Sequence, residues 1–279
     1  MTLPDLYEIL ELPVMVSNAV KEYAGSHASV LDEDLKERLY KRECWDQAVK
    51  ELQSRIGDDP FGLYILSELL QLACQTYESY QEKGIEDKIF VSTMQFCTRF
   101  LADHKKSYGN YVFEWAWWFV RELSMQEFRI GTLEYEFVDG EERRIYIHIP
   151  SDARMAPGYI QESFSTYREF LKQHYPEWTE ADWYCDSWMM SPELKKLLPK
   201  DSNILAFQEL FEIVSIDYES LAALDWVYPG AKADYADLPE NTSLQRNMKY
   251  FLLGGGKVGW AEGKLFTSGG RVCPYFTAG

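Results

Sequence analysis

The sequence is poor in basic residues and has a small, scattered set of cysteines. Its 279 residues include 28 Lys and Arg against 45 Asp and Glu, a formal net charge of -17. Nucleic-acid and anionic-membrane surfaces need clustered basic side chains, so this balance argues against both kinds of partner. The five cysteines form no CxxC motif and no Cys/His pair at metal-ligand spacing. We therefore expect a reduced, cytoplasmic protein without a metal site.

Long apolar runs are also missing. No window approaches the roughly 18 apolar residues of a membrane-spanning helix, and the first residues, MTLPDLYEIL, have neither a basic start nor an apolar run. We expect a protein that is neither exported nor membrane-spanning. With 46% hydrophobic and 15% aromatic residues, the chain can bury the core of one large or two modest domains.

The first part of the chain carries the apolar spacing of helices. The clearest helix is Leu63 to Tyr80, whose apolar residues form one broad stripe before Gly84. Asp32 can cap an earlier helix, and one long helix is expected from Ile85 to about Tyr108. A tryptophan-rich helix follows at Phe113 to Leu123. Its tryptophans are expected in the core or at a domain interface, with a ligand-stacking box as the alternative.

The apolar period changes to two after this helix. A long strand is predicted from Phe128 to Phe137 with a bulge at Gly131, and Asp139-Gly140 predicts a hairpin into the next strand. The fold class is therefore α+β. We expect a helical N-terminal domain over residues 1–124 and a mixed-sheet domain over residues 125–279.

Shorter elements complete the second domain. Ser202 and Thr242 are candidate N-caps of two helices, and strand patterns occur at Glu212–Tyr218 and Val258–Phe266. Loop residues dominate between the first of these strands and Pro239.

The chain is organised around a strand, a loop, a helix and a second strand. Residues 144–149 alternate isoleucine with polar or aromatic side chains, the pattern of a strand with one apolar and one mixed face. The loop Ser151–Gly158 leads to a helix with an apolar stripe from Ile160 to Leu171, and an aromatic-rich strand follows at Asp182–Met190. Such a crossover makes the strands parallel, so their C-terminal ends share one sheet edge, where ligands gather.

The loop between this strand and helix is a candidate anion site. Ser151 or Asp152 can open the next element, and unpaired N–H groups at a helix N-terminus bind pyrophosphate or carboxylate well. Arg143, Arg144 and Arg154 lie beside the loop and can add positive charge. The loop SDARMAPG has no glycine-rich phosphate fingerprint, so the alternative is a simple connection.

Six phrases of the sequence carry a further signal. They are YESYQEKGIEDKIFVSTMQFCTRF at Tyr77–Phe100, FRIGTLEYEF at Phe128–Phe137, IHIPSD at Ile147–Asp152, CDSWMMSPEL at Cys185–Leu194, SNILAFQELF at Ser202–Phe211 and DLPENTSLQR at Asp237–Arg246. Together they resemble a bacterial family of two-domain proteins. That family joins a helical N-acyltransferase N-terminal domain to a C-terminal domain similar to the GNAT superfamily of N-acyltransferases.

This resemblance implies a GNAT-like fold and acyl-CoA, such as acetyl-CoA, as co-substrate. In GNAT-type enzymes a strand, loop and helix cradle the pyrophosphate of acyl-CoA, and two strands splay so that the pantetheine lies between them. On this chain the cradle falls on Ile149, Ser151, Asp152, Ala153 and Arg154. The GNAT loop signature, Arg or Gln followed by Gly-x-Gly or Gly-x-Ala, is absent.

Two functions of different classes follow. The first is an acyl-CoA-dependent N-acyltransferase that transfers an acyl group to a small-molecule amine by direct attack. The second is a non-catalytic GNAT-like binding or regulatory module, which the missing loop glycines favour. Binding of CoA, and then thiol release that requires an amine, would separate them. The sequence does not fix the oligomeric state, and a homodimer is compatible with it.

The residues of the central unit supply candidates for catalysis. His148 is the candidate general base, because an imidazole ordinarily has a pKa of about 6.5 and can accept a proton near neutral pH. With Asp152 it spells HxxxD, and the alternative is a hydrogen-bonded structural histidine. Cys185 is either a nucleophile with His148 as base or a buried small hydrophobe. Tyr184 and Tyr218 are candidate acids for the leaving thiolate.

A second group of residues has candidate roles in substrate binding. Ser187 and Trp188 line the cleft if the strands splay, and otherwise pack. Four further residues have polar side chains that either clamp the backbone or orient substrate, through three amides and one guanidinium. They are Asn203, Gln208, Gln245 and Arg246.

Overall fold

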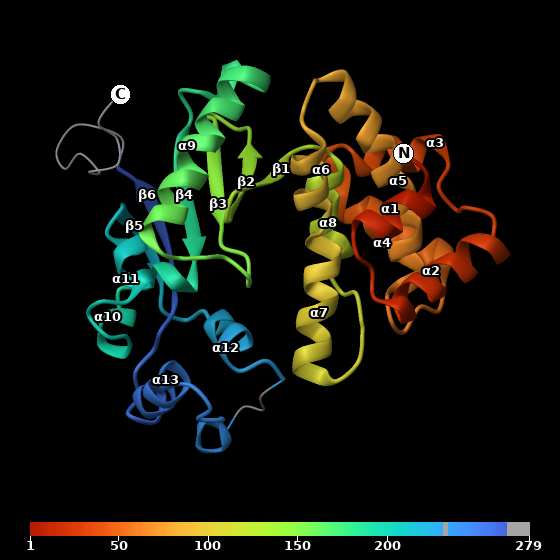
Figure 1. Cartoon of the computed structure of the whole chain (residues 1–279). Helices are drawn as coiled ribbons and strands as arrows, with labels where there is room; N and C mark the ends of the chain where they lie inside the picture. Colours follow the sequence, from red (N-terminus) through yellow and green to blue (C-terminus); the bar gives the residue numbers. More distant parts are fainter. Residues whose placement is uncertain (231–233, 267–279) are drawn as a thin grey trace. The chain divides into compact units, whose positions relative to one another are not determined.

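The computed structural model describes residues 1–230 and 234–266 (Figure 1). The chain divides into two compact units, Met1–Ile130 and Gly131–Gly279. The first unit is helical and the second contains a mixed sheet, so the predicted α+β class is confirmed. Within the described ranges, no helix has the length and apolar character needed to cross a membrane.

The first unit consists of helices around α5 (Leu63–Glu82), whose side chains Leu66, Leu69 and Leu70 are fully buried. The N-cap predicted at Asp32 is confirmed, because its carboxylate accepts a hydrogen bond from Leu35 N at 2.8 Å. The other elements are α1 (Leu3–Ile9), α2 (Val14–Ser26), α3 (Glu33–Leu39), η1 (Arg42–Cys44), α4 (Trp45–Ile56), α6 (Asp87–Met94), α7 (Phe96–Tyr108), α8 (Ala116–Leu123) and β1 (Glu127–Ile130).

The long helix predicted from Ile85 to Tyr108 is wrong, because the chain breaks at Gln95 into α6 and α7. The break lets two aromatic side chains reach the core. Phe90 packs edge-on against Tyr80 with ring centroids 5.2 Å apart, and Phe96 stacks on Phe119 at 5.6 Å. In one straight helix, side chains six residues apart would point to different sides.

The second unit is built on strands in the order β2-β3-β4-β6-β5. Their bounds are β2 (Leu133–Val138), β3 (Arg144–His148), β4 (Asp182–Ser187), β5 (Phe211–Asp217) and β6 (Trp260–Leu265). β2 and β3 form the predicted antiparallel hairpin, and β3 and β4 are parallel as predicted. β6 pairs antiparallel with both β4 and β5.

Helix α9 (Pro157–His174) covers the apolar face of this sheet, along β3 and β4 (Figure 1). Tyr135 of β2 stacks on Tyr167 of α9 with ring centroids 3.8 Å apart, and its hydroxyl lies 2.8 Å from Ser163 Oγ. Ile145 and Ile147 of β3 are fully buried. The predicted alternation in β3 therefore separates a buried apolar face from a polar one.

The strand predicted from Phe128 through Phe137 is also wrong, because β1 ends at Ile130 and β2 starts at Leu133. Gly131 between them has φ +65° and lies against α9. A Cβ at this position would sit 2.9 Å from Ser163 Cα. The glycine therefore permits a turn and a close helix contact, and it is not a bulge within one strand.

The short helix η2 (Pro176–Trp178) connects α9 to the start of β4. The remaining helices gather at the other end of the sheet, where β4 ends (Figure 1). They are η3 (Trp188–Met190), α10 (Leu194–Leu197), α11 (Asn203–Gln208), α12 (Ala222–Val227), η4 (Tyr235–Asp237) and α13 (Ser243–Leu253). The caps predicted at Ser202 and Thr242 are confirmed. The segment expected to be loop before Pro239 contains α12 and η4. Its buried residues Ala223, Val227 and Tyr228 join an apolar cluster that holds it in place.

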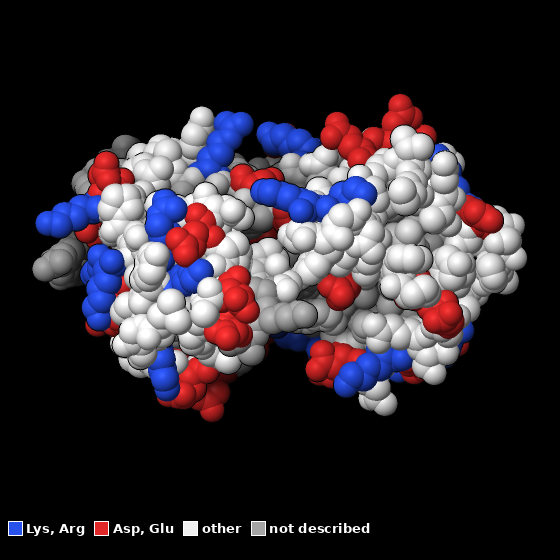
Figure 2. Space-filling model, turned by 90° about the horizontal axis from the view of Figure 1, so that it is seen from below, with Lys and Arg blue, Asp and Glu red and all other residues white. Residues whose placement is uncertain are grey.

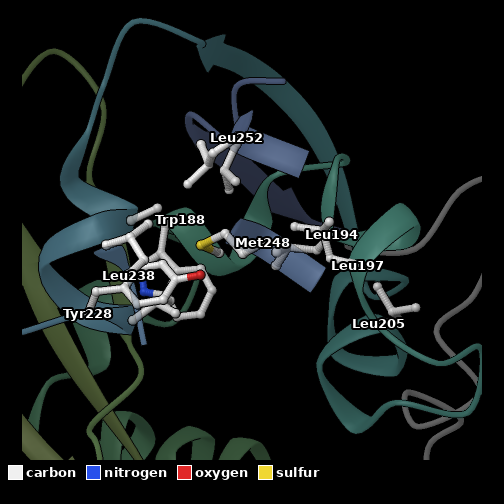
Figure 3. Close-up of a cluster of buried hydrophobic side chains, with 11 residues drawn as sticks. Trp188, Leu194, Leu197, Leu205, Tyr228, Leu238, Met248 and Leu252 are labelled. Carbon is white, nitrogen blue, oxygen red and sulfur yellow. The ribbon is translucent and has the colours of Figure 1, made fainter. Parts of the chain in front are cut away.

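That cluster forms a second core beside the sheet. Figure 3 shows Met248 of α13 lying between Trp188 of η3 and Leu194 of α10. Because Trp188 directly follows β4, this core fixes the end of β4 and the chain beyond it.

Candidate functional site

The face of the sheet opposite α9 is lined by polar and aromatic side chains. Strand register brings them together, since Glu136 pairs with Tyr146, Tyr146 with Tyr184, and Tyr184 with Lys264. Successive side chains of a strand point to opposite faces, so the alternate residues share this face. They are Glu134, Glu136, Arg144, Tyr146, His148, Asp182, Tyr184, Asp186, Glu262 and Lys264.

The parallel pair β3 and β4 opens at its C-terminal end. The last paired residues are Tyr146 and Tyr184, although β3 continues to His148 and β4 to Ser187. Beyond this point β4 stays paired with β6, through Asp186 with Glu262 and Ser187 with Ala261. The two parallel strands therefore diverge next to His148, at the sheet edge where ligands of such folds bind.

His148 is held by a carboxylate from the neighbouring strand. Its Nε2 lies 2.9 Å from Glu136 Oε2, and the two side chains are 19% and 7% exposed. Across the opening, Asp186 lies close enough to His148 for their charges to interact. An imidazole beside carboxylates can take up a proton and hold the resulting cation.

Asp186 is the second acid–base group of the opening. Desolvation raises the pKa of its carboxyl, and the charge of Glu262 raises it further, whereas the hydrogen bond from Trp260 and the charge of His148 lower it. The Trp260 Nε1–H donates to Asp186 Oδ1 at 2.5 Å. Tyr146 in turn donates its hydroxyl hydrogen to Glu262 at 2.8 Å.

Tyr184 lies where the strands are still paired. Its ring stacks on Tyr146 at a centroid distance of 5.8 Å, with the Arg144 guanidinium at 4.8 Å and Lys264 Nζ at 5.7 Å. Lys264 also donates to Asp182 at 2.6 Å. Tyr184 is therefore a buried phenol surrounded by cations at the closed end of the opening. Tyr218 is 41% exposed and follows β5, away from this group.

The structure argues against Cys185 as a nucleophile. Cys185 alternates with Tyr184 and Asp186, so its side chain points to the apolar face covered by α9. It is fully buried, and desolvation raises the pKa of its thiol far above the ordinary value. A thiol in this state supplies almost no thiolate near neutral pH. Cys185 and His148 therefore point to opposite faces of the sheet, and the hypothesis of Cys185 as a nucleophile with His148 as base is corrected.

The loop after β3 runs from Ile149 to the N-terminus of α9. Neither Ser151 nor Asp152 caps the helix, because the N-cap is Ala156, which offers no side-chain hydrogen bond. Ser151, Asp152 and Arg154 are exposed, and Ile149 and Ala153 are half-buried. Two bonds fix the loop, from Ala153 N to Pro150 O at 2.9 Å and from Arg154 N to Thr132 Oγ1 at 2.5 Å.

Arg154 supplies positive charge at this loop. Its guanidinium lies over the Tyr159 ring at 5.1 Å, which orients the charge beside the first turn of α9. On the face drawn in Figure 2, basic and acidic side chains are interspersed among uncharged ones. An anion would therefore be held by local groups such as Arg154 and backbone N–H donors.

Most of the other candidate residues hold the backbone around the opening. Ser187 caps η3 through a bond from Met189 N, and Trp188 is buried in the second core. Gln208 donates to Met189 O at 2.6 Å and Ser191 O at 2.9 Å, so it clamps η3. Ser187, Trp188 and Gln208 thus meet at the end of β4.

The last three candidates do not lie on the polar face. Asn203 is exposed at the start of α11. Gln245 completes the capping box of α13 and donates to Val227 O at 2.9 Å. Arg246 is exposed and donates to Glu240 O at 3.1 Å. These contacts are those of caps and surface residues.

Two family models match the chain, one for each part. The model of an N-acyltransferase N-terminal domain matches residues 1–125, and that of a GNAT-like C-terminal domain matches residues 127–265. The chain belongs to this two-domain acyltransferase family. No curated protein sequence matches it.

Solved structures share the fold of this acyltransferase family member. A mutant acyltransferase in complex with octanoyl-CoA is 20% identical, with a TM-score of 0.75 over 95% of this chain and 87% of that one. An acyltransferase in complex with decanoyl-CoA and teicoplanin is 21% identical, with a TM-score of 0.69 over 95% and 99%. An acyltransferase in complex with CoA and 10C-teicoplanin is 20% identical, with a TM-score of 0.69 over 95% of this chain and 99% of that one. At this identity the likeness shows the fold.

Sequence reasoning missed three residues of this family member's polar face. Glu136, Asp186 and Glu262 flank His148 and Tyr146, yet none was singled out in a chain rich in acidic residues. The Asp139-Gly140 signal could not have found Glu136, because a two-residue turn there would place Glu136 opposite Arg143. The observed register pairs Val138 with Arg144, and this places Glu136 opposite Tyr146 and diagonal to His148.

Proposed function

We propose that the protein is an acyl-CoA-dependent N-acyltransferase in which a small amine attacks the thioester directly. The observation that carries this proposal is the divergence of β3 and β4 beside His148, with an uncapped helix N-terminus at the end of the adjoining loop. The opening suits an extended arm such as pantetheine. Backbone N–H groups and a nearby cation suit its pyrophosphate.

The donor would be bound by the loop from Ile149 to Arg154. Without the GNAT glycines, the Arg154 guanidinium and backbone N–H groups of the loop other than that of Ala153, which bonds Pro150 O, would have to contact the pyrophosphate. Backbone donors serve this purpose whatever the side chain, provided that the loop presents them to the ligand. The bonds that fix the loop to Pro150 and Thr132 support such preorganisation.

The reaction then uses groups of the polar face. The amine nitrogen attacks the thioester carbonyl carbon, a C–N bond forms, and the C–S bond breaks. His148 accepts the proton that the amine loses, while a phenol protonates the leaving thiolate to give CoA. Tyr184 is the candidate acid, since it lies on the same face as His148. The protonated imidazole then releases its proton to solvent and the phenolate takes one up, which regenerates both groups.

The choice of donor and acceptor for the first assays follows from the related structures. They contain octanoyl-CoA, decanoyl-CoA or CoA, and two of them also contain teicoplanin or 10C-teicoplanin. Octanoyl-CoA and decanoyl-CoA should therefore be tested beside acetyl-CoA. Teicoplanin should be tested as an acceptor beside small primary amines.

Calorimetry with CoA and these acyl-CoAs is the first test. We expect saturable binding that Arg154→Gln weakens and that Arg246→Gln, a matched change on the exposed face of α13, leaves unchanged. No binding at millimolar ligand would reject the proposal. Binding without amine-dependent thiol release would favour the non-catalytic module that the missing loop glycines suggest.

A further inference from the structure

The contact between β2 and β3 bears on which nitrogen of His148 can act as a base. The backbone partner of His148 is Glu134, but its side chain reaches diagonally to Glu136, with 2.9 Å between Nε2 and Oε2. Diagonal neighbours in antiparallel strands lie within reach of long side chains. The Glu136 side chain is only 7% exposed, so the surrounding protein restricts its carboxylate.

The chemistry of this contact selects one form of the ring. A glutamate is ordinarily ionised near neutral pH, and a carboxylate only accepts hydrogen bonds. With an ionised Glu136, the hydrogen resides on Nε2. In a neutral imidazole, the other nitrogen, Nδ1, carries the lone pair that can accept a proton.

We propose that Glu136 is a positioning residue that holds His148 as the Nε2–H tautomer and thereby makes Nδ1 the base for the incoming amine. The inference deepens the proposed function and rests on it. When Nδ1 takes the amine proton, the ring becomes a cation that still donates its Nε2–H to Glu136 Oε2. Asp186 also lies close enough to the ring for their charges to interact. The proton moves from the amine to Nδ1, while the leaving thiolate takes its proton from the phenol.

The tautomer can be read in the free full-length protein, without a substrate. The chain has only four histidines. The ring nitrogen signals of His148 in a 15N-histidine NMR spectrum are therefore assigned by their loss in His148→Ala. Above the pH range where imidazole is protonated, we expect the wild-type ring to carry its hydrogen on Nε2. A ring with its hydrogen on Nδ1 would overturn the proposal, and this result needs no Glu136 variant to fold.

Glu136→Gln supplies the second measurement. An amide NH₂ can donate to Nε2, which stabilises the opposite tautomer, as known for carboxylate–histidine pairs. We expect the His148 signals to move toward the Nδ1–H form. Glu142→Gln changes an exposed glutamate in the loop between β2 and β3 and should leave those signals in place. Unchanged signals in Glu136→Gln would contradict the proposal.

Kinetics with octanoyl-CoA test the consequence for catalysis. Glu136→Gln should lower kcat by about tenfold or more, leave KM for octanoyl-CoA within about twofold, and have no further effect in a His148→Ala background. Equal losses with and without His148 would show a structural role and reject the positioning one.

The two proposals fail in different ways. If His148 is the Nε2–H tautomer but the protein turns over no donor, the acyltransferase function is rejected and the role of Glu136 in placing the hydrogen is supported. Turnover by a protein with the Nδ1–H tautomer would keep the function and reject the role of Glu136.

Discussion

At the scale of single residues, the proposed chemistry depends most on His148. His148→Ala should lower turnover by about 100-fold or more and leave the affinity for CoA nearly unchanged, because a general base acts in the transition state. Thiol release measures the first quantity and calorimetry the second. His27→Ala, which removes an exposed histidine of the first unit, is the control. Full activity in folded His148→Ala would leave the histidine a structural role.

Asp186 should make stability depend on pH. Desolvation raises the pKa of its carboxyl above the ordinary 3.8, so the folded state binds a proton more tightly than the unfolded state. Stability from this group is therefore gained as pH falls through the raised pKa, and ionised Asp186 costs stability at neutral pH. Asp186→Asn mimics the protonated form. It should raise the free energy of unfolding at neutral pH by less than about 1 kcal/mol, since the side chain is partly solvated.

Denaturant titrations at neutral and acid pH measure this effect. The difference between Asp186→Asn and wild type should shrink as the pH falls through the raised pKa and be lost below 3.8, where both states of the wild type are protonated. Asp182→Asn is the control of opposite sign, because it removes the carboxylate that pairs with Lys264 at 2.6 Å. A destabilising Asp186→Asn at neutral pH would refute the argument.

The sequence located His148 on a mixed strand face, because alternation with isoleucine is visible within one strand. It could not show that Cys185 faces the opposite way from His148, since that depends on the register between β3 and β4. The same dependence hid Asp186 and Glu262. Register is set by pairing between distant segments, and one strand alone does not carry it.

At the scale of elements, local signals predicted where some helices start better than periodicity predicted whether a helix or strand is continuous. The caps at Asp32, Ser202 and Thr242 act through hydrogen bonds within a few residues, and all three were predictable. The break at Gln95 and the turn at Gly131 depend on packing against other elements. Helical or strand periodicity ran through both, so the sequence favoured one long element in each place.

Gly131 and Gly84 separate the effects of backbone conformation and close packing. Their φ values are nearly equal, at +65° and +67°. A Cβ added at Gly131 would lie 2.9 Å from Ser163 Cα, whereas a Cβ added at Gly84 would have no neighbouring atom within 4 Å. Gly84→Ala should cost about 1 kcal/mol of unfolding free energy. Gly131→Ala should cost about 2 kcal/mol more, because α9 must move. Denaturant unfolding measures both, and equal losses would show that α9 gives way easily.

At the scale of the whole molecule, composition allowed one large or two modest domains and argued against a broad basic surface. The change of apolar period and the family phrases predicted two domains and their type. The α+β class and the two-domain family are confirmed. The acceptor could not be predicted, because side chains from separate strands, loops and helices surround the opening. Their combined shape is a property of the folded chain only.

Donor binding should stabilise the whole chain. A ligand that binds only the folded state adds about 2.7 kcal/mol at 100 times its dissociation constant. CoA should therefore raise the unfolding temperature in a concentration-dependent way, measured by calorimetric melting. The rise should be smaller for Arg154→Gln and unchanged for Arg246→Gln. A rise of equal size in all three proteins would place the bound CoA away from the loop before α9.

The opening between β3 and β4 is made by backbone pairing. β3 is bonded along its length to β2, through five register pairs, and to β4 only through three. It cannot follow β4 where that strand turns toward β6 and the second core. Side chains that border the gap can therefore be exchanged without closing it. In evolution or in engineering, substrate preference could diverge by substitution while the framework that admits the donor is inherited unchanged.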